Sequence, residues 1–151
     1  VNSVSSVRQN PESTWMISAS THSMNVSTFD VRTFWVPVST ITANEDKSQS
    51  YSHSWQDGNT LILCSSSGIL HKFDTRNPSR ELPKLILPEQ LQMAGDIQCN
   101  SMKEFAVFGV PTFAIGGYSD DNSFFCPLPP PEQECVFGTF LDNDIILTTA
   151  E

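Results

Sequence analysis

The sequence predicts an all-β fold built from repeated antiparallel units, and two similar segments are the main evidence for it. The chain has Phe-Asp-Val-Arg at 29–32 and Phe-Asp-Thr-Arg at 73–76, so the second copy follows the first by 44 residues. A run of alternating residues precedes each copy, at 15–20 and at 61–66. Ten Pro and seven Gly supply turns, and charged residues make up only 17% of the chain. A period of about 40–45 residues that closes on an aromatic residue and Asp is the spacing of β-propeller blades.

The first predicted blade covers about residues 3–42. Its strands are expected at 3–7, 14–20, 26–30 and 35–42. Asn10-Pro11 makes the first turn, because proline fixes its own φ and asparagine bonds to the nearby backbone. Pro37 cannot donate to a β-ladder, so the fourth strand is predicted to lie at the edge of its sheet.

The second predicted blade covers about residues 51–87. Its strands are expected at 51–55, 60–66, 69–74 and 81–87. Residues with turn chemistry stand at the corners, since Asp57-Gly58 precedes the second strand and Gly68 precedes the third. The turn residues and the 44-residue repeat therefore predict the same four-stranded blade.

An irregular third blade is expected at about 96–128, and the start of a fourth at about 134–151. The first three strands of the third blade are expected at 104–108, 112–117 and 123–126. The proline run at 129–131 cannot donate ladder hydrogen bonds, so the fourth strand of this blade is predicted to be missing or displaced. The fourth blade is expected to open with strands at 135–140 and 145–150.

The stretch 57–76 resembles one repeat of the WD-repeat family. In that family an Asp-Gly turn opens the second strand, small polar residues end it, and Trp-Asp closes the third. This chain has Phe in place of that Trp and lacks the Gly-His dipeptide that often begins a repeat, so the Asp-His-Ser-Trp tetrad of regular repeats is not carried over. The resemblance extends over about residues 4–87 and implies a propeller of four-stranded antiparallel blades. It also implies structural roles at blade corners for Phe29, Asp30, Phe73, Asp74, Asp57 and Gly58.

The number of predicted blades bears on the size of the whole protein. Propellers close with four to eight blades, and two full and two partial blades do not close a ring. The chain begins at Val1 and stops within the fourth predicted blade. We expect it to be a piece of a larger propeller, and the alternative is that partner segments supply the missing blades.

Composition favours protein partners over nucleic acid. The net charge of −9 would repel a phosphate backbone and suits a basic protein partner. No apolar run approaches the roughly 18–20 residues of a membrane-spanning helix, so no span is expected.

The four cysteines contain no C-x-x-C pair, so a structural zinc site is not expected. Cys64 is expected to be a buried thiol within a strand. Cys126 and Cys135 flank a proline-rich loop, which leaves a bridge between them open. The family resemblance implies reduced thiols and an intracellular protein of the cytoplasm or nucleus. A glycosylation sequon begins at Asn25 and matters only if the chain is secreted.

The sequence contains no recognisable active site. None of His22, His53 and His71 belongs to a metalloprotease motif, and the chain has no G-x-S-x-G motif and no phosphate-binding glycine loop. His71 is expected on the solvent-facing side of its strand. We therefore predict a chain that is not an enzyme and has no cofactor. A propeller enzyme such as a glycosidase is the alternative, but it needs acidic residues that converge on a central pocket.

Arg32 and Arg76 are the candidate partner-binding residues. In some WD-repeat proteins a Trp-Asp-x-Arg in consecutive blades contacts the adaptor of a cullin ubiquitin ligase, and the two Phe-Asp-x-Arg copies are similar to that arrangement. The other interpretation is that each arginine pairs with an Asp or a carbonyl at its own blade corner. The resemblance implies a non-catalytic protein-interaction scaffold within a multi-protein complex, with a ubiquitin-ligase substrate receptor as the alternative.

Overall fold

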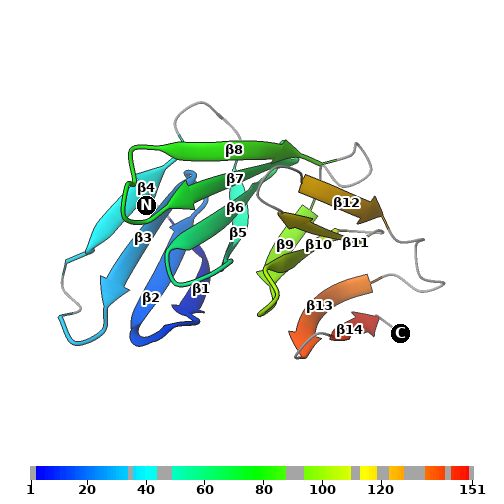
Figure 1. Ribbon diagram of the computed structural model, residues 1–151, viewed down its shortest axis with the longest axis horizontal. Coiled ribbons are helices and arrows are strands. Elements are labelled where there is room, and N and C mark those ends of the chain that lie inside the picture. Colours follow the sequence, from blue (N-terminus) through cyan, green and yellow to red (C-terminus); the bar gives the residue numbers. More distant parts are fainter. Residues whose placement is uncertain are drawn as a thin grey trace.

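The computed structural model describes residues 3–33, 36–43, 49–87, 94–109, 113–118, 123–127, 135–141 and 144–149. Within these ranges the chain forms β-strands and no helix. The described residues therefore include no helix that is long and apolar enough to cross a membrane. The strands form three four-stranded sheets and one two-stranded pair, which follow one another in sequence order (Figure 1).

Each four-stranded sheet is an antiparallel meander in which consecutive strands pair. Sheet 1 consists of β1 (Val4–Asn10), β2 (Ser13–Thr21), β3 (Asn25–Asp30) and β4 (Ser39–Thr42). Sheet 2 consists of β5 (Ser50–Trp55), β6 (Thr60–Ser65), β7 (Ile69–Asp74) and β8 (Glu81–Ile86). Sheet 3 consists of β9 (Ala94–Cys99), β10 (Glu104–Gly109), β11 (Phe113–Tyr118) and β12 (Ser123–Pro127). The two-stranded pair is β13 (Cys135–Leu141) and β14 (Asp144–Thr149).

The predicted equivalence of the two Phe-Asp-x-Arg segments is confirmed. They end β3 and β7, which are the third strands of two different sheets. Phe29 lies opposite Ile17 in sheet 1, and Phe73 lies opposite Leu61 in sheet 2. Both pairs join residues 12 positions apart, so the two sheets share one register as well as one strand order.

Sheet 3 corrects the predicted strand order. The segment 104–108 belongs to β10, the second strand rather than the first, because the unpredicted β9 precedes it. The segments predicted as second and third strands are the third and fourth, β11 and β12. A fourth strand is therefore present, and Pro127 is tolerated at its end because β12 lies at the sheet edge.

Two apolar clusters hold neighbouring sheets together. Between sheets 1 and 2, Val26 and Ile41 pack with Leu61 and Phe73, and each of these side chains is at most 2% exposed. Between sheets 2 and 3 the cluster consists of Ile62, Cys64, Leu70, Leu87, Ile97, Phe105 and Val107. Each sheet is thus stabilised largely by burial against its neighbours, as in other repeat architectures.

The second sheet also corrects the expected orientation of His71. Its side chain is 1% exposed rather than solvent-facing, and Nδ1 contacts the Glu81 carboxylate of the neighbouring strand β8. The imidazole stacks near the Phe73 ring, with the ring centroids 6.4 Å apart. Glu81 therefore provides the polar partner that allows a histidine to lie inside the sheet packing.

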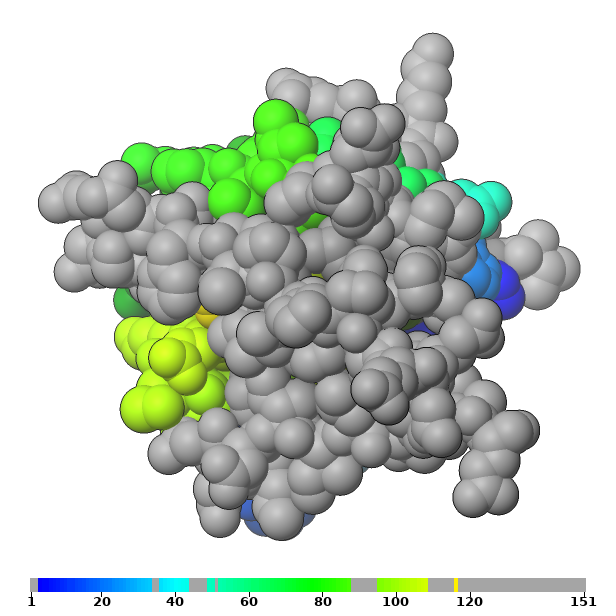
Figure 2. All heavy atoms as spheres, turned by 90° about the vertical axis from the view of Figure 1, so that its right-hand side faces the viewer, coloured from blue at the N-terminus to red at the C-terminus, as the bar shows by residue number. Residues whose placement is uncertain are grey.

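The outer strand of sheet 2 and the hairpin of sheet 3 carry exposed apolar side chains. Segments of both regions reach the surface in Figure 2, in green and yellow-green. Ile86 of β8 is 72% exposed and Met102, in the turn before β10, is 56% exposed. Single exposed apolar residues of this kind are common on protein surfaces and do not identify a site.

Candidate functional site

The turns after the first and third strands lie at the same end of each antiparallel sheet. We call the surface they form the turn face, which consists of residues 10–13, 30–33, 56–60, 74–77 and 100–104. Contacts between sheets show that the turns after the three first strands adjoin one another. Asn10 Nδ2 donates to the Gly58 carbonyl over 2.8 Å, and Gln56 Nε2 donates to the Lys103 carbonyl over 3.2 Å.

The two candidate arginines occupy equivalent corners of the turn face. Arg32 donates from Nε to Asp30 Oδ1 over 2.9 Å and from Nη2 to Asp30 Oδ2 over 2.6 Å. Arg76 makes the same two contacts with Asp74, over 2.9 and 2.8 Å. In both corners the aspartate also accepts from the arginine backbone N–H. The Asp-x-Arg sequence therefore forms a closed turn with a bidentate ion pair.

These corner pairs are accessible to solvent. The side chains of Arg32 and Arg76 are 61% and 70% exposed. The hydrogen bonds from each arginine lower the pKa of its aspartate, Asp30 and Asp74, to about 2. Both arginines are thus exposed on the turn face and paired locally, a combination that neither sequence interpretation described alone.

The first corner carries an aromatic side chain beside its arginine. The guanidinium of Arg32 lies 5.6 Å from the centroid of the Trp15 ring, a cation–π arrangement. Trp15 is itself 53% exposed. The position 44 residues later holds Asn59, so the two corners share their ion pair and differ in the surface beside it.

The predicted corner residues Asp57 and Gly58 connect three sheets. The Gly58 N–H donates to Glu12 Oε1 in sheet 1 over 3.0 Å. Asp57 accepts from the backbone of Asn59 over 2.9 Å and faces Lys103 Nζ of sheet 3 at 3.5 Å. The turn motif predicted a local hairpin, and its links to the neighbouring sheets depend on long-range packing.

The first strands of the sheets carry a polar cluster that no sequence motif marks. Arg8 Nη2 donates to Asp96 Oδ1 over 2.8 Å and to Ser52 Oγ over 3.3 Å. The Ser52 hydroxyl donates to the same carboxylate oxygen over 2.5 Å. These residues stand 44 positions apart in β1, β5 and β9. This 44-residue spacing of polar residues is the signal in the sequence that could have identified the cluster.

His53 joins sheets 1 and 2 as a buried, neutral imidazole. Its Nδ1 and Nε2 each lie 2.7 Å from a serine hydroxyl, those of Ser6 and Ser18. Burial and the nearby Arg8 charge lower the pKa of His53 to about 3. The ring is therefore uncharged near neutral pH and serves as a hydrogen-bonding link between the sheets.

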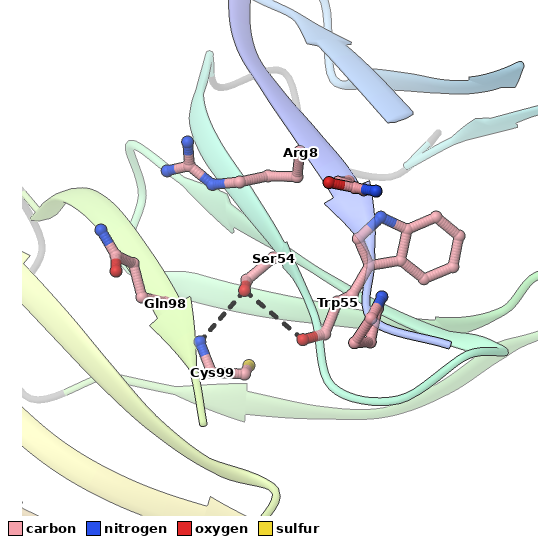
Figure 3. A pocket seen from close by; sticks show the side chains of 7 residues that line it. Arg8, Ser54, Trp55, Gln98 and Cys99 are labelled. Carbon is pink, nitrogen blue, oxygen red and sulfur yellow. Dashed lines mark hydrogen bonds between the residues drawn. The ribbon is translucent and has the colours of Figure 1, made fainter. Parts of the chain in front are cut away.

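A pocket of about 300 Å³ lies among the first strands of the three sheets (Figure 3). Arg8, Ser54 and Gln98 line it, and the Cys99 N–H donates to Ser54 Oγ over 3.0 Å. Burial raises the pKa of the Cys99 thiol to about 12, so it does not supply a thiolate at neutral pH. Within the described ranges no three His, Cys, Asp or Glu residues gather to hold a metal ion. Cys64 and Cys99 are free thiols, and the side chains of Cys126 and Cys135 lie outside the described part.

Comparison with known proteins identifies the fold. No family model and no curated protein sequence matches the chain. Among solved structures, it is similar to the WD40 β-propeller domain of Doa1, with a TM-score of 0.76 and 14% identity. It is also similar to a chain of the mitotic checkpoint complex, with a TM-score of 0.75 and 12% identity. Each match covers 97% of this chain, which spans only 48% and 46% of those two chains. The chain therefore has a WD-repeat-like fold of antiparallel four-stranded propeller blades, which confirms the predicted fold class.

Proposed function

We propose, from the WD-repeat-like propeller fold, that this chain is part of a non-catalytic protein-interaction scaffold. The observation that carries the proposal is the turn face of this fold, where two equivalent Asp-x-Arg corners display exposed arginines one blade apart. Trp15 adds an exposed aromatic surface at the first corner. Aromatic residues and arginine are the side chains most enriched at protein–protein contacts.

We also propose that the scaffold belongs to a larger propeller protein. Leu61 and Phe73, on the side of sheet 2 that faces sheet 1, are at most 2% exposed. The matching positions of sheet 1 hold Ile17 and Phe29, which are only partly buried. A further blade against this side of sheet 1 would bury them in the same way. Its presence would also agree with the greater length of the two structural neighbours.

The proposed partners are other proteins within a multi-protein complex rather than nucleic acid. The net charge of −9 supports this choice, because an acidic surface repels phosphate and attracts basic protein surfaces. We also propose that the protein is located in the cytoplasm or nucleus. Both compartments keep thiols reduced, which suits the free thiols of Cys64 and Cys99. One structural neighbour is itself a chain of a mitotic checkpoint complex.

A substrate receptor of a cullin-type ubiquitin ligase is the second candidate function. The repeated geometry of Arg32 and Arg76 favours it, since one partner would meet two identical groups on neighbouring blades. Each guanidinium has five N–H donors and uses one on Nε and one on Nη2 for its own aspartate. The remaining donors are available to accepting groups of an adaptor.

Affinity capture with the whole protein tests both candidates. Replacement of Arg32 and Arg76 by Ala is expected to abolish capture of the partner and leave the melting temperature nearly unchanged, because exposed ion pairs contribute little stability. Arg80→Ala serves as the control, since it removes an exposed arginine outside the two corners. Unchanged capture by the double variant would eliminate both the receptor and the corner-based interface. A large drop in melting temperature would show instead that the arginines brace the fold.

A further inference from the structure

The turn between β7 and β8 presents a serine between two arginines. Its sequence is Arg76-Asn77-Pro78-Ser79-Arg80, and all five residues are exposed. Arg76 belongs to the second Asp-x-Arg corner, which we call the β7 corner, and its side chain is 70% exposed. The equivalent position of the first corner, three residues after Arg32, holds Trp35 in the sequence. The serine is therefore a property of one corner and not of the repeat.

Two consecutive β-turns hold this serine at a tip of the chain. The Asn77 N–H donates to the Asp74 carbonyl and the Arg80 N–H donates to the Asn77 carbonyl, each over 3.0 Å. Pro78 is the second residue of the latter turn, where its fixed φ is favourable, so Ser79 is the third. Among the described residues none bonds to the Ser79 hydroxyl, and none of the described backbone bonds joins this turn to another sheet. An enzyme can therefore reach the hydroxyl and open the turn without separating the strands.

The charges around Ser79 form an unbalanced cluster. Asp74 and Arg76 form the ion pair of the β7 corner, whereas Arg80 forms no ion pair with a described residue. The pKa of Asp74 is lowered to about 2, chiefly by its hydrogen bonds from Arg76 and to a smaller extent by the charge of Arg80. Arg80 thus acts electrostatically on the corner. One carboxylate and two guanidinium groups give the cluster a net charge of about +1 at neutral pH, in a chain whose net charge is −9.

A phosphate on Ser79 would reverse the sign of this cluster. At pH 7 a phosphoserine carries a charge of about −1.5 to −2 and three strong acceptor oxygens. Arg76 uses only its Nε and one Nη2 donor for Asp74, and the guanidinium of Arg80 adds a second planar set of donors. Both arginines therefore suit a phosphate, and the modified cluster has a net negative charge.

The same arginines suit the enzyme that would add the phosphate. Protein kinases distinguish substrates by the pattern of charge around the acceptor hydroxyl. Arginines three residues before and one residue after Ser79 fit a substrate groove that is lined by carboxylates. In the transfer, Ser79 Oγ attacks the γ-phosphorus of ATP while the bond from that phosphorus to its bridging oxygen breaks. ADP leaves, and the hydroxyl proton passes to the catalytic base of the kinase.

We propose that Ser79 is a phosphorylation site of an arginine-directed protein kinase, and that Arg76 and Arg80 bind the phosphate and thereby block the β7 corner. The modification withdraws Arg76 from an outside partner and places negative charge where that partner meets the chain. The regulatory part rests on the proposed interaction function of the corners, whereas the modification and its contacts do not.

Phosphate incorporation into the folded chain tests the site. The full chain is incubated with ATP, Mg²⁺ and a kinase that selects arginine three residues before the acceptor, and intact mass spectrometry counts the phosphates added. We expect one phosphate, which Ser79→Ala prevents. Ser67→Ala is the matched control, because Ser67 is an exposed turn serine with no Lys or Arg within four residues, and it should leave incorporation unchanged. The same product from Ser79→Ala as from wild type, or no phosphate at all, would overturn the assignment.

The second pKa of the phosphate tests whether the two arginines bind it. This pKa is about 6 for a phosphoserine without such partners, and nearby cations lower it because they favour the dianion. ³¹P NMR should give a lower pKa for the folded phosphorylated chain than for the same chain in urea, and Arg80→Ala should raise it. Arg32→Ala is the control, since it removes an exposed arginine from the other corner, and it should have no effect. Equal pKa values in the folded and denatured chains would overturn binding by the arginines.

Partner capture separates this inference from the proposed function. The phosphorylated chain should capture the partner at least about tenfold less than the untreated chain, and Ser79→Ala treated with the kinase should capture it fully. If capture depends on Arg32 and Arg76 but phosphorylation leaves it unchanged, the scaffold proposal stands and the regulatory role of Ser79 fails. If Ser79 is phosphorylated and its phosphate pKa is lowered, but capture is independent of the two arginines, the site stands and the corner-based interface fails.

Discussion

Arg8 of β1 donates to Asp96 of β9 over 2.8 Å, so a single ion pair joins the first and third sheets across the second. The two residues are 88 positions apart, and Ser52 of β5 stands midway between them and bonds to both. Side chains of three successive repeats therefore meet at one point. Such a contact forms only when all three sheets are packed, so it should report on cooperativity between them.

Arg8→Met and Asp96→Asn should each destabilise the chain, and their effects should not add. The side chains are 32% and 17% exposed, so we expect a coupling energy of about 1 kcal/mol in a double-mutant cycle. Urea denaturation of the four proteins measures it. The pair Lys84–Glu81 within β8, at 3.4 Å, is the control and should couple by less than about 0.5 kcal/mol. Additive effects of Arg8 and Asp96 would show that the pair contributes no link between sheets.

Stability should decrease with acidification because of His53. Its pKa in the folded chain is lowered to about 3, whereas the unperturbed value is 6.5. Between these values the unfolded chain binds more protons than the folded chain, so the free energy of unfolding falls as pH falls from about 6.5 toward 3. The limiting slope for one group is about 1.4 kcal/mol per pH unit.

Urea denaturation at pH 7.5, 6.0 and 4.5 checks this dependence. The arginines lower the pKa of Asp30 and Asp74 to about 2 in the folded chain. Protonation of these two carboxylates therefore reduces stability only as pH falls below about 4, which is outside the range measured. His53→Gln removes the titrating group, so it should flatten the profile over the same range even if it lowers stability. An equal slope in wild type and variant would assign the effect to other groups.

Sequence reasoning succeeded where local chemistry and the repeat agreed. The Phe-Asp-x-Arg copies placed β3 and β7, and turn residues bounded the strands of sheet 2. It failed for β9, because Gly95, Asp96 and Gln98 have low strand propensity. The strand forms through its pairing with β10, in which Asp96 and Gln98 lie opposite Phe108 and Ala106. The 44-residue period held even there, since β11 ends at Tyr118, 44 residues after Asp74. If the 44-residue period had been applied to sheet 3, it would have identified 113–118 as the third strand, although strand propensity suggested the second.

The functional surface was less predictable than the strands. The Asp-x-Arg corners were identified because their partners lie two residues apart in the chain. The pocket among the first strands combines Arg8 of β1, Ser54 of β5 and Gln98 of β9, so no local motif marks it. The same limit applies to His53, whose buried position follows from two serines of another sheet. Polar contacts between blades depend on packing geometry, which one sequence does not reveal.

Replacement of Gly68 by another residue should reduce stability, because the Gly68 backbone lies in the left-handed region with φ of 76°. Met24, the residue 44 positions earlier, has φ of 60°, so both turns before the third strands share this conformation. Gly68→Ala should destabilise the chain by about 1 kcal/mol, the cost of a side chain in this region. Thermal or urea denaturation measures it. Gly95→Ala is the matched control, since a Cβ there meets nothing within 4 Å, and it should be neutral; equal losses would contradict a backbone cause.

Phe29 and Phe73 occupy equivalent positions but should differ in their contribution to stability. Phe73 is 2% exposed in the cluster between sheets 1 and 2, whereas Phe29 is partly buried on the side of sheet 1 away from sheet 2. In this chain Phe73→Ala should cost about 3–5 kcal/mol, and Phe29→Ala clearly less, because it leaves a smaller cavity. Urea denaturation of both variants gives the comparison.

The same two variants in a longer protein that contains this chain test whether another blade covers sheet 1. A covering blade would bury Phe29 as sheet 1 buries Phe73, so the cost of Phe29→Ala should rise toward that of Phe73→Ala. The cost of Phe73→Ala should stay the same, because its neighbours are already present in this chain. If Phe29→Ala costs equally little in both proteins, no blade packs on this side of sheet 1. The proposal of a larger propeller in which sheet 1 has two neighbours would then be wrong.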